Sequence, residues 1–179
     1  DQAGQNGAEC HVGVTVTDIV QGDDHWSVTA SDGQRWRTRS VVIADGSASP
    51  WPQRLGLGAK RVQTATTMSV RLEGQGNLKS GTTRFEFGLV KQGFAWAFPV
   101  AGGVNIGVGS FIGKQDADPE QVLSQLLPDL GFSADAGLRQ RGQLRVWNGH
   151  HRLNGNGIVV VGDAASLCDP FLAEGLRPA

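Results

Sequence analysis

The sequence contains no tyrosine and only two cysteines in 179 residues, and neither sign of charge predominates. Cys10 and Cys168 form no CxxC pair and have no cluster of metal ligands beside them, so neither a zinc site nor a disulfide framework is indicated. Lys and Arg number 16 and Asp and Glu 17, giving a net charge of -1, so the chain lacks the basic surplus of nucleic-acid-binding proteins. We therefore expect a protein of the reduced cytoplasm that binds neither a metal ion nor nucleic acid.

Signals for membrane insertion and for several enzyme classes are also missing. No apolar run approaches the ~18 residues that cross a bilayer. No GxSxG, HExxH or P-loop pattern occurs, so hydrolase, zinc protease and nucleoside triphosphatase chemistry have no residues to rest on. His150 and His151 are adjacent, and adjacent histidines rarely share one metal ion, so no metal site is expected there. Glycine is in excess: 26 occur, about twice the usual ~7%, which predicts many turns.

The first forty residues predict a three-stranded antiparallel meander. Valines alternate with polar or small residues from Val12, a second alternating run covers Trp26–Ala30, and a third covers Gln34–Ser40. Gly22-Asp23-Asp24 and Asp32-Gly33, which separate the runs, are typical turn sequences.

Three arginines share one face of the third run. Arg35, Arg37 and Arg39 alternate with Trp36 and Thr38, so the two sets point to opposite sides of a strand. We interpret the arginine row as a solvated strand face, with a phosphate contact as the alternative.

Two short apolar runs lack alternation, which is typical of strands buried on both faces of a parallel sheet. Val41–Ala44 is followed by Asp45-Gly46, and Ile158–Val161 is followed by Gly162-Asp163. Ligands bind beyond the carboxyl ends of such strands, where glycine lets the backbone approach phosphate and a carboxylate accepts hydrogen bonds from sugar hydroxyls. The pairs predict two walls of one dinucleotide site, although a single Asp after a strand is more often a turn former or helix cap.

A second block of alternating runs predicts an antiparallel sheet followed by one amphipathic helix. The runs cover about 66–73, 83–90, 94–100 and 104–111. Asp118 is expected to cap a helix that begins at Pro119 and stops at Pro128, with four apolar residues on one face.

Three stretches carry a resemblance to a known family. Val41–Gly56, VVIADGSASPWPQRLG, and Gly157–Pro178, GIVVVGDAASLCDPFLAEGLRP, resemble the second and third flavin-binding motifs of the FAD-dependent monooxygenase-like superfamily. Between them Phe94–Pro99, FAWAFP, followed by Val104–Gly109, VNIGVG, resembles the aromatic motif and following strand of the geranylgeranyl reductase branch. Three motifs in the family's order and spacing make a chance match improbable.

The resemblance implies FAD as the cofactor and a role for each matching residue. Asp163 is expected to bind ribityl or ribose hydroxyls, and Gly162 to let the backbone approach the diphosphate. Asp45 and Gly46 are expected near the flavin as part of the shared Asp-Gly motif. Pro170 is expected beside the isoalloxazine ring. Gly175 and Leu176 are expected to place backbone amides of a helix start at the N1/O2 edge of that ring.

The resemblance also implies that Phe94, Trp96, Phe98 and Pro99 bind substrate. A polyprenyl chain needs a long apolar cavity, and aromatic side chains on one strand face provide one. Plain core packing of Trp96 and Phe98 is the alternative. The sequence identifies no catalytic residue.

Several positions depart from the family pattern. The family usually has Tyr at the position of Phe94, so tyrosine-dependent protonation is excluded. Many relatives carry Arg where this chain has Pro52 and Gln53, which puts direct use of NADPH in doubt. Ser166 and Ala173 replace residues that are commonly Gly and would narrow the approach to the flavin.

The predicted fold class is α/β, and α+β within this sequence: part of a Rossmann-like FAD-binding domain with an inserted antiparallel β-sheet substrate domain. Residues 1–64 and 143–179 are assigned to the FAD-binding domain, and residues 65–142 to the substrate domain. No GxGxxG turn precedes Val41, although such a flavoprotein needs one to hold the diphosphate. We therefore expect an internal fragment that holds FAD weakly or not at all by itself.

For the parent protein, we predict a reductase that passes a hydride from reduced FAD to a C=C bond of a geranylgeranyl or other prenyl group. A hydroxylating FAD-dependent monooxygenase and a non-enzymatic β-rich binding module are the alternatives. The predicted partner is a prenylated small molecule or lipid. NADPH or another electron donor is left open, as is peripheral membrane contact of a cytoplasmic protein.

Overall fold

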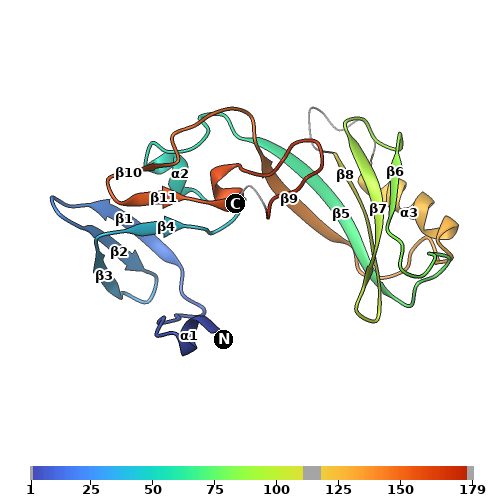
Figure 1. Ribbon diagram of the computed structural model, residues 1–179, viewed down its shortest axis with the longest axis horizontal. Helices are drawn as coiled ribbons and strands as arrows, with labels where there is room; N and C mark the ends of the chain where they lie inside the picture. The colour runs from blue at the N-terminus through green and yellow to red at the C-terminus, as the bar shows by residue number, and fades with distance from the viewer. Residues whose placement is uncertain (1, 111–117, 177–179) are drawn as a thin grey trace. The chain divides into compact units, whose positions relative to one another are not determined.

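Figure 1 shows the computed structural model, which describes residues 2–110 and 118–176. The chain divides into two compact units. The first unit comprises Asp1–Val42 and Asn154–Val159, and the second comprises Ile43–Leu153 and Val160–Ala179. Strands predominate over helices among the described residues, which confirms the predicted α+β class. The domain boundaries at 64/65 and 142/143 stay a prediction.

The first unit contains the predicted antiparallel meander. Its elements are α1 (Gln2–Gln5), β1 (Val16–Gln21), β2 (Trp26–Ala30) and β3 (Arg35–Thr38), with β2 in the middle of the sheet. The expected start of the first strand near Val12 is wrong, because Val12 lies in a turn and is 93% exposed. The last residue of β2, Ala30, pairs with Val16, so β2 has no residue left to pair with the chain before Val16.

The arginine row of β3 lies on the solvated face of the strand. Arg35 and Arg37 are exposed, as is Arg39 just beyond the strand, whereas Trp36 and Thr38 are half-buried. The interpretation of this row as a solvated strand face is confirmed.

A second three-stranded sheet joins segments that are far apart in the sequence. Its strands are β4 (Val41–Ile43), β10 (Asn154–Gly155) and β11 (Ile158–Val160), in the order β10-β11-β4. The Val41 N–H donates to the Gly157 carbonyl over 2.9 Å, and the Val161 N–H donates to the Ile43 carbonyl over 3.0 Å. Partner positions therefore rise together along both strands, so β4 and β11 run parallel and their carboxyl ends are neighbours.

The expectation that these two strands are buried on both faces is wrong. Ile43, Ile158 and Val160 are buried, but Val42 is 63% exposed and Val159 is half-buried. Side chains alternate between the faces of a strand, so Val42 points away from the face that buries Ile43. The unbroken apolar run indicated the strand correctly, but it did not reveal that one face is left open.

The second unit is built on a five-stranded antiparallel sheet (Figure 1). Its strands are β5 (Gln63–Glu73), β6 (Arg84–Phe87), β7 (Gly93–Val100), β8 (Gly103–Ser110) and β9 (Gln140–Val146), in the order β6-β7-β8-β5-β9. The predicted antiparallel sheet is confirmed; Phe111, the expected end of its fourth run, lies outside the described residues. Strand β9 was not predicted, because the first four of its residues are exposed and show no alternation.

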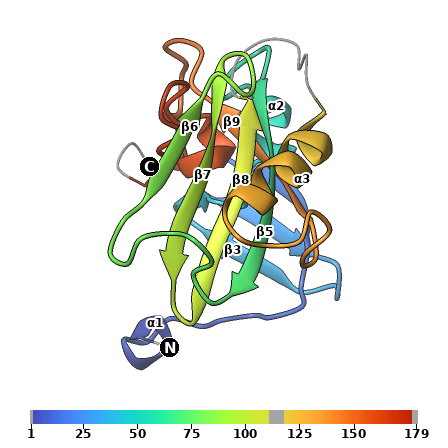
Figure 2. The ribbon, with the colours of Figure 1, turned by 90° about the vertical axis from the view of Figure 1, so that its right-hand side faces the viewer.

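Helix α3 (Pro119–Asp129) covers one face of this sheet, packing on β8 and β5 (Figure 2). The Asp118 side chain accepts a hydrogen bond of 3.0 Å from the Glu120 N–H, as expected for the cap. The helix runs one residue past Pro128, its expected end. None of the described helices is long and apolar enough to cross a membrane.

Candidate functional site

The aspartates predicted to bind the cofactor follow neighbouring strand ends in the second unit. Asp45 comes two residues after β4, and Asp163 follows β11 within a short 3₁₀ helix, η1 (Gly162–Ala165). Gly46 and Gly162 beside them have φ angles of +81° and +57°, in the region where a Cβ is unfavourable. The structure therefore brings both glycine-aspartate pairs to the same edge of the small sheet.

A buried arginine, which carries no signal in the sequence, is hydrogen-bonded to the turn after β4. Arg145 of β9 is 8% exposed, and its Nη2 donates to the Ser49 carbonyl over 2.6 Å. Ser49 belongs to the turn after β4, because its N–H donates to the Gly46 carbonyl. Burial raises the pKa of Asp163 above its ordinary value, and the positive charge of Arg145 offsets part of that rise.

The Nη1 atom of Arg145 indicates whether the sheet edge that carries Asp45 and Asp163 suits an anionic group. Among the described residues, the buried Nη1 has no hydrogen-bond partner. A buried donor left without an acceptor costs roughly 1–3 kcal/mol. The oxygen of a phosphate or a flavin would satisfy it, so the residues present fit an anionic cofactor. A lone Arg within a polar run gave no sequence signal, because only the fold buries it.

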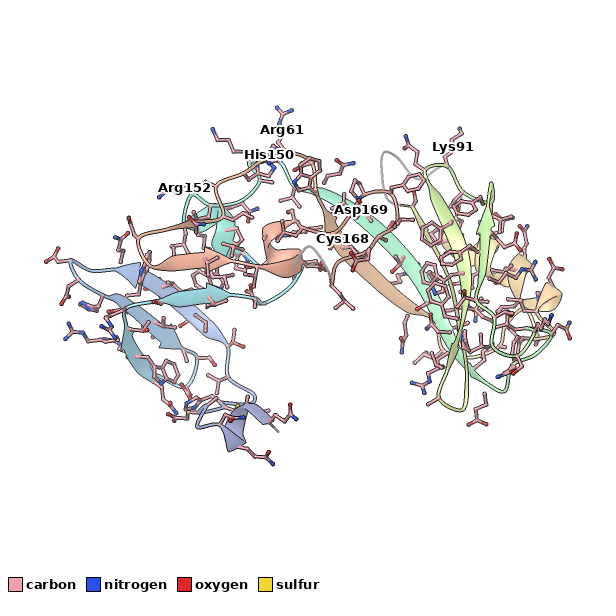
Figure 3. The ribbon with its side chains drawn as sticks, in the orientation of Figure 1. Arg61, Lys91, His150, Arg152, Cys168 and Asp169 are labelled. Atoms are coloured by element: carbon pink, nitrogen blue, oxygen red, sulfur yellow. The ribbon has the colours of Figure 1, made fainter. Side chains whose placement is uncertain are left out.

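The segment after η1 is held against the end of β9. Cys168 forms a parallel bridge with Val146, and the Trp147 N–H donates to the Cys168 carbonyl over 2.8 Å. The Asp169 carboxylate accepts hydrogen bonds from the N–H groups of Phe171 and Leu172, at 2.9 and 2.7 Å. These contacts fix the loop labelled by Cys168 and Asp169 in Figure 3.

The loop after η1 carries three residues that were predicted to bind the cofactor. Two of them, Gly175 and Leu176, lie near Asp163 or in the lining of the neighbouring cavity. A Cβ added to Gly175 would lie 3.7 Å from the Asp163 Oδ1, so these two predicted residues are close together. Leu176 lines the neighbouring cavity. Pro170 is half-buried in a turn and does not line that cavity.

Burial also determines the chemistry of the loop's thiol. Cys168 is 1% exposed, and desolvation, followed by the charges of Asp163, Asp169 and Glu174, raises its pKa to about 11. The thiol is therefore protonated at neutral pH, which makes it a packing group rather than a nucleophile.

An apolar cavity of about 550 Å³ lies beside this loop in the second unit. Aromatic residues line one side: Phe94, Trp96 and Phe98 from β7, with Phe85 from β6. The Phe85 ring meets those of Phe94 and Phe98 edge-on, with centroids 5.5 and 5.2 Å apart. Residues 172–176 of the loop complete the lining together with Thr67 and Leu144.

Alternation along β7 separates the four predicted substrate residues. Phe94, Trp96 and Phe98 share the cavity side, while Ala95 and Ala97 pack into the core beneath α3. Pro99 has the parity of the alanines, is exposed and does not line the cavity.

The indole of Trp96 is held in place by its neighbours on β8. Its Nε1 donates to the Asn105 Oδ1 over 2.8 Å, and its ring lies over Gly107, its partner residue in the sheet. A Cβ on Gly107 would come within 2.2 Å of the Trp96 ring, so only glycine allows this close approach.

Within the described part of the chain, no group of three or more His, Cys, Asp or Glu side chains could hold a metal ion. The site therefore consists of a polar edge, with two carboxylates and a buried guanidinium, next to an aromatic cavity. Gly175 belongs to both parts.

Comparison with known proteins gives two similar curated sequences. The menaquinone reductase of Mycobacterium tuberculosis is 28% identical over 167 residues, which cover 84% of this chain and 40% of that protein. The digeranylgeranylglycerophospholipid reductase of Methanocaldococcus jannaschii is 25% identical over 189 residues, covering 98% of this chain and 47% of that protein. The chain thus spans less than half the length of these relatives. No family model matches the chain.

Solved structures share the fold at lower identity. A geranylgeranyl bacteriochlorophyll reductase-like protein from Thermoplasma acidophilum superposes with a TM-score of 0.80 at 22% identity, covering 97% of this chain and 47% of that one. A variant of the halogenase PltM in complex with FAD gives a TM-score of 0.69 at 18% identity, over 98% and 41% of the two chains. Together these matches confirm the predicted fold class and the resemblance to the geranylgeranyl reductase branch of the FAD-dependent monooxygenase-like superfamily.

Proposed function

We propose that this chain forms the substrate cavity and part of the flavin site of an FAD-dependent oxidoreductase that reduces C=C bonds of a prenyl group. The observation that carries the proposal is the position of Gly175, which adjoins Asp163 and also lines the aromatic cavity. A ligand in the cavity would therefore lie next to the residues assigned to the cofactor. The names of the relatives support the same substrate class, since one acts on a digeranylgeranyl lipid.

The polar edge would hold the cofactor. Gly46 and Gly162, without Cβ atoms, leave space for the cofactor beside the backbone. Asp163 would accept hydrogen bonds from sugar or ribityl hydroxyls, and the buried Arg145 Nη1 would donate to an anionic oxygen. When bound, FAD supplies the hydride.

The aromatic cavity would bind and orient the prenyl chain. Its aromatic wall offers apolar contact without directional hydrogen bonds, which suits a long hydrocarbon. Glu174 is the one ionisable side chain among the described residues that line it.

Binding of a prenyl alcohol tests the cavity on the chain itself. We expect geranylgeraniol to bind saturably to the 179-residue chain and to change its tryptophan fluorescence, to which Trp96 contributes. Phe98→Ala should weaken binding about tenfold, because a buried aromatic contact contributes on the order of 1.5–3 kcal/mol. Phe171→Ala is the matched control, since Phe171 is 74% exposed and lies outside the cavity lining. No saturable binding, or equal weakening in both variants, would contradict the proposed cavity.

Turnover distinguishes the candidate reactions. The chain joined to the part of a relative that the match does not cover would be supplied with reduced FAD and a geranylgeranyl substrate under anaerobic conditions. A product that gains two hydrogen atoms per double bond supports the reductase. A product that gains one oxygen atom, formed only when oxygen is admitted, identifies the hydroxylating alternative instead. A joined protein that holds no flavin points to the non-enzymatic binding module.

A further inference from the structure

A second cavity, of about 770 Å³, lies in the second unit apart from the aromatic one and has a different lining. One wall is formed by Gln53 of α2 (Trp51–Arg54) and by residues 56–61 of the connection that leads into β5. Asn148 and residues 150–152, after β9, form the other wall. We name this cavity the basic groove, because it is lined by three cationic side chains, Lys60, Arg61 and Arg152, and by two imidazoles, His150 and His151.

Positively charged side chains are concentrated at the basic groove. The whole chain has a net charge of -1, yet none of the described residues that line the groove is acidic. In the described part of the chain, Lys60 and Arg61 form no ion pair with a carboxylate. Figure 3 shows Arg61, His150 and Arg152 on the two segments that form the walls. The groove is thus a local positive site on a chain without a basic surplus.

Hydrogen bonds hold the two walls together. The Gly58 N–H donates to the Arg152 carbonyl over 2.8 Å, and the Asn148 Nδ2 donates to the Arg61 carbonyl over 2.8 Å. The Asn148 Oδ1 is then left to accept from the Nε2 of His151, 2.8 Å away. The Trp147 ring meets His150 edge-on, with centroids 5.5 Å apart. The backbone that carries the cations is therefore positioned before a ligand arrives, which lowers the entropy cost of binding.

We propose that the basic groove is a binding site for a phosphate ester, distinct from the flavin edge and from the prenyl cavity. Lys60 and Arg61 would neutralise the phosphate charge, and an imidazole N–H of His150 would donate a hydrogen bond to it. The groove volume falls within the range of about 300–1,000 Å³ that is usual for small-ligand sites. The phosphate could belong to a soluble nucleotide or to a lipid headgroup. The inference does not depend on the function proposed above.

Inorganic pyrophosphate is the first probe, titrated into the 179-residue chain by calorimetry at fixed salt. We expect saturable binding, and at least a tenfold loss of affinity in the variant Lys60→Gln/Arg61→Gln, because the variant removes two charge-assisted hydrogen-bond donors. Both side chains are exposed, so the variant should fold, which circular dichroism checks. The control Arg35→Gln/Arg39→Gln removes the same charge from the exposed arginine row and should bind as the unchanged chain does.

The outcomes separate the sources of the phosphate and the ways the inference fails. Binding of ADP without binding of adenosine supports a nucleotide. Binding to phosphatidylcholine vesicles that contain phosphatidic acid, but not to vesicles without it, supports a lipid headgroup. No saturable binding of pyrophosphate overturns the inference. A loss in the control equal to that in the groove variant also overturns it, because attraction would then be a property of overall charge.

Discussion

The two faces of the five-stranded sheet use the same strands for opposite purposes. One face is closed by α3, where Ala95 and Ala97 of β7 meet fully buried side chains such as Leu123 and Leu127. The opposite face carries the aromatic rings of β7 and the cavity of about 550 Å³. Small residues let a helix approach on one side, whereas large rings line a cavity on the other. Core packing and the lining of the cavity thus fall on alternate positions of one strand.

The largest effect is expected on the face closed by α3. Leu123→Ala should lower the free energy of unfolding by about 2–5 kcal/mol, because Leu123 is 0% exposed and its truncation leaves a cavity. Leu138→Ala is the control; with Leu138 81% exposed, the change should stay within about 0.5 kcal/mol. Urea unfolding measures both. Equal effects would show that the closed face is not the stabilising one.

The second-largest effect is expected in the protection of the Cys168 thiol from alkylation. Cys168 packs with Phe94 and Val146 on the face of the sheet that carries the aromatic rings. A pKa raised from 9.0 to about 11 lowers the thiolate fraction roughly 100-fold, and burial adds a steric barrier. In the Cys10→Ser variant, iodoacetamide should therefore modify the folded chain at least 100-fold more slowly than the urea-unfolded chain. Mass spectrometry follows the reaction. Similar rates in the folded and unfolded chain would mean that the packing of Cys168 against Phe94 and Val146 does not shield the thiol from the reagent.

Gly107→Ala should cost about 1–3 kcal/mol, because the added Cβ overlaps the Trp96 ring. If the cost arises from that ring, it should shrink in the Trp96→Ala background. Urea unfolding of the two single variants and the double variant gives the coupling directly. Additive effects would show that Gly107 is required for another reason.

The smallest effect concerns Asp163 and its dependence on pH. The pKa of this group is raised in the folded chain, so the folded state binds more protons than the unfolded state as pH rises from the ordinary value of 3.8. The folded chain therefore loses stability as pH rises from 3.8 through the raised pKa of Asp163. Asp163→Asn should match the unchanged chain at about pH 3 and become the more stable of the two at pH 7. Thermal melts from about pH 3 to pH 7 measure the difference in stability between the variant and the unchanged chain. A difference that does not change with pH would contradict the raised pKa of Asp163 as its cause.

Much of this site could be predicted from local pattern. The alternation of Phe94, Trp96 and Phe98 with small residues placed the rings on one face, and the capping Asp118 located α3. Two apolar runs that each end in a glycine-aspartate pair indicated strands whose carboxyl ends meet. These features were accessible because they depend on residues within a few positions of one another.

Features that depend on distant partners could not be predicted in this way. Strand β9 looks polar in isolation and becomes a strand by pairing with β5. Arg145 becomes a buried donor because that pairing carries it to the turn at Ser49, 96 residues away along the chain. The basic groove likewise exists because residues 53–61 are hydrogen-bonded to residues 148–152.

The sequence alone therefore determined the strands, the capped helix, the aromatic face and the family resemblance, since periodicity and short motifs are written in consecutive residues. The tertiary structure alone decided which face stays open, which charge is buried and which cations share a groove. Burial and electrostatic interaction act through space, and they are set only when the sheet register brings remote segments together.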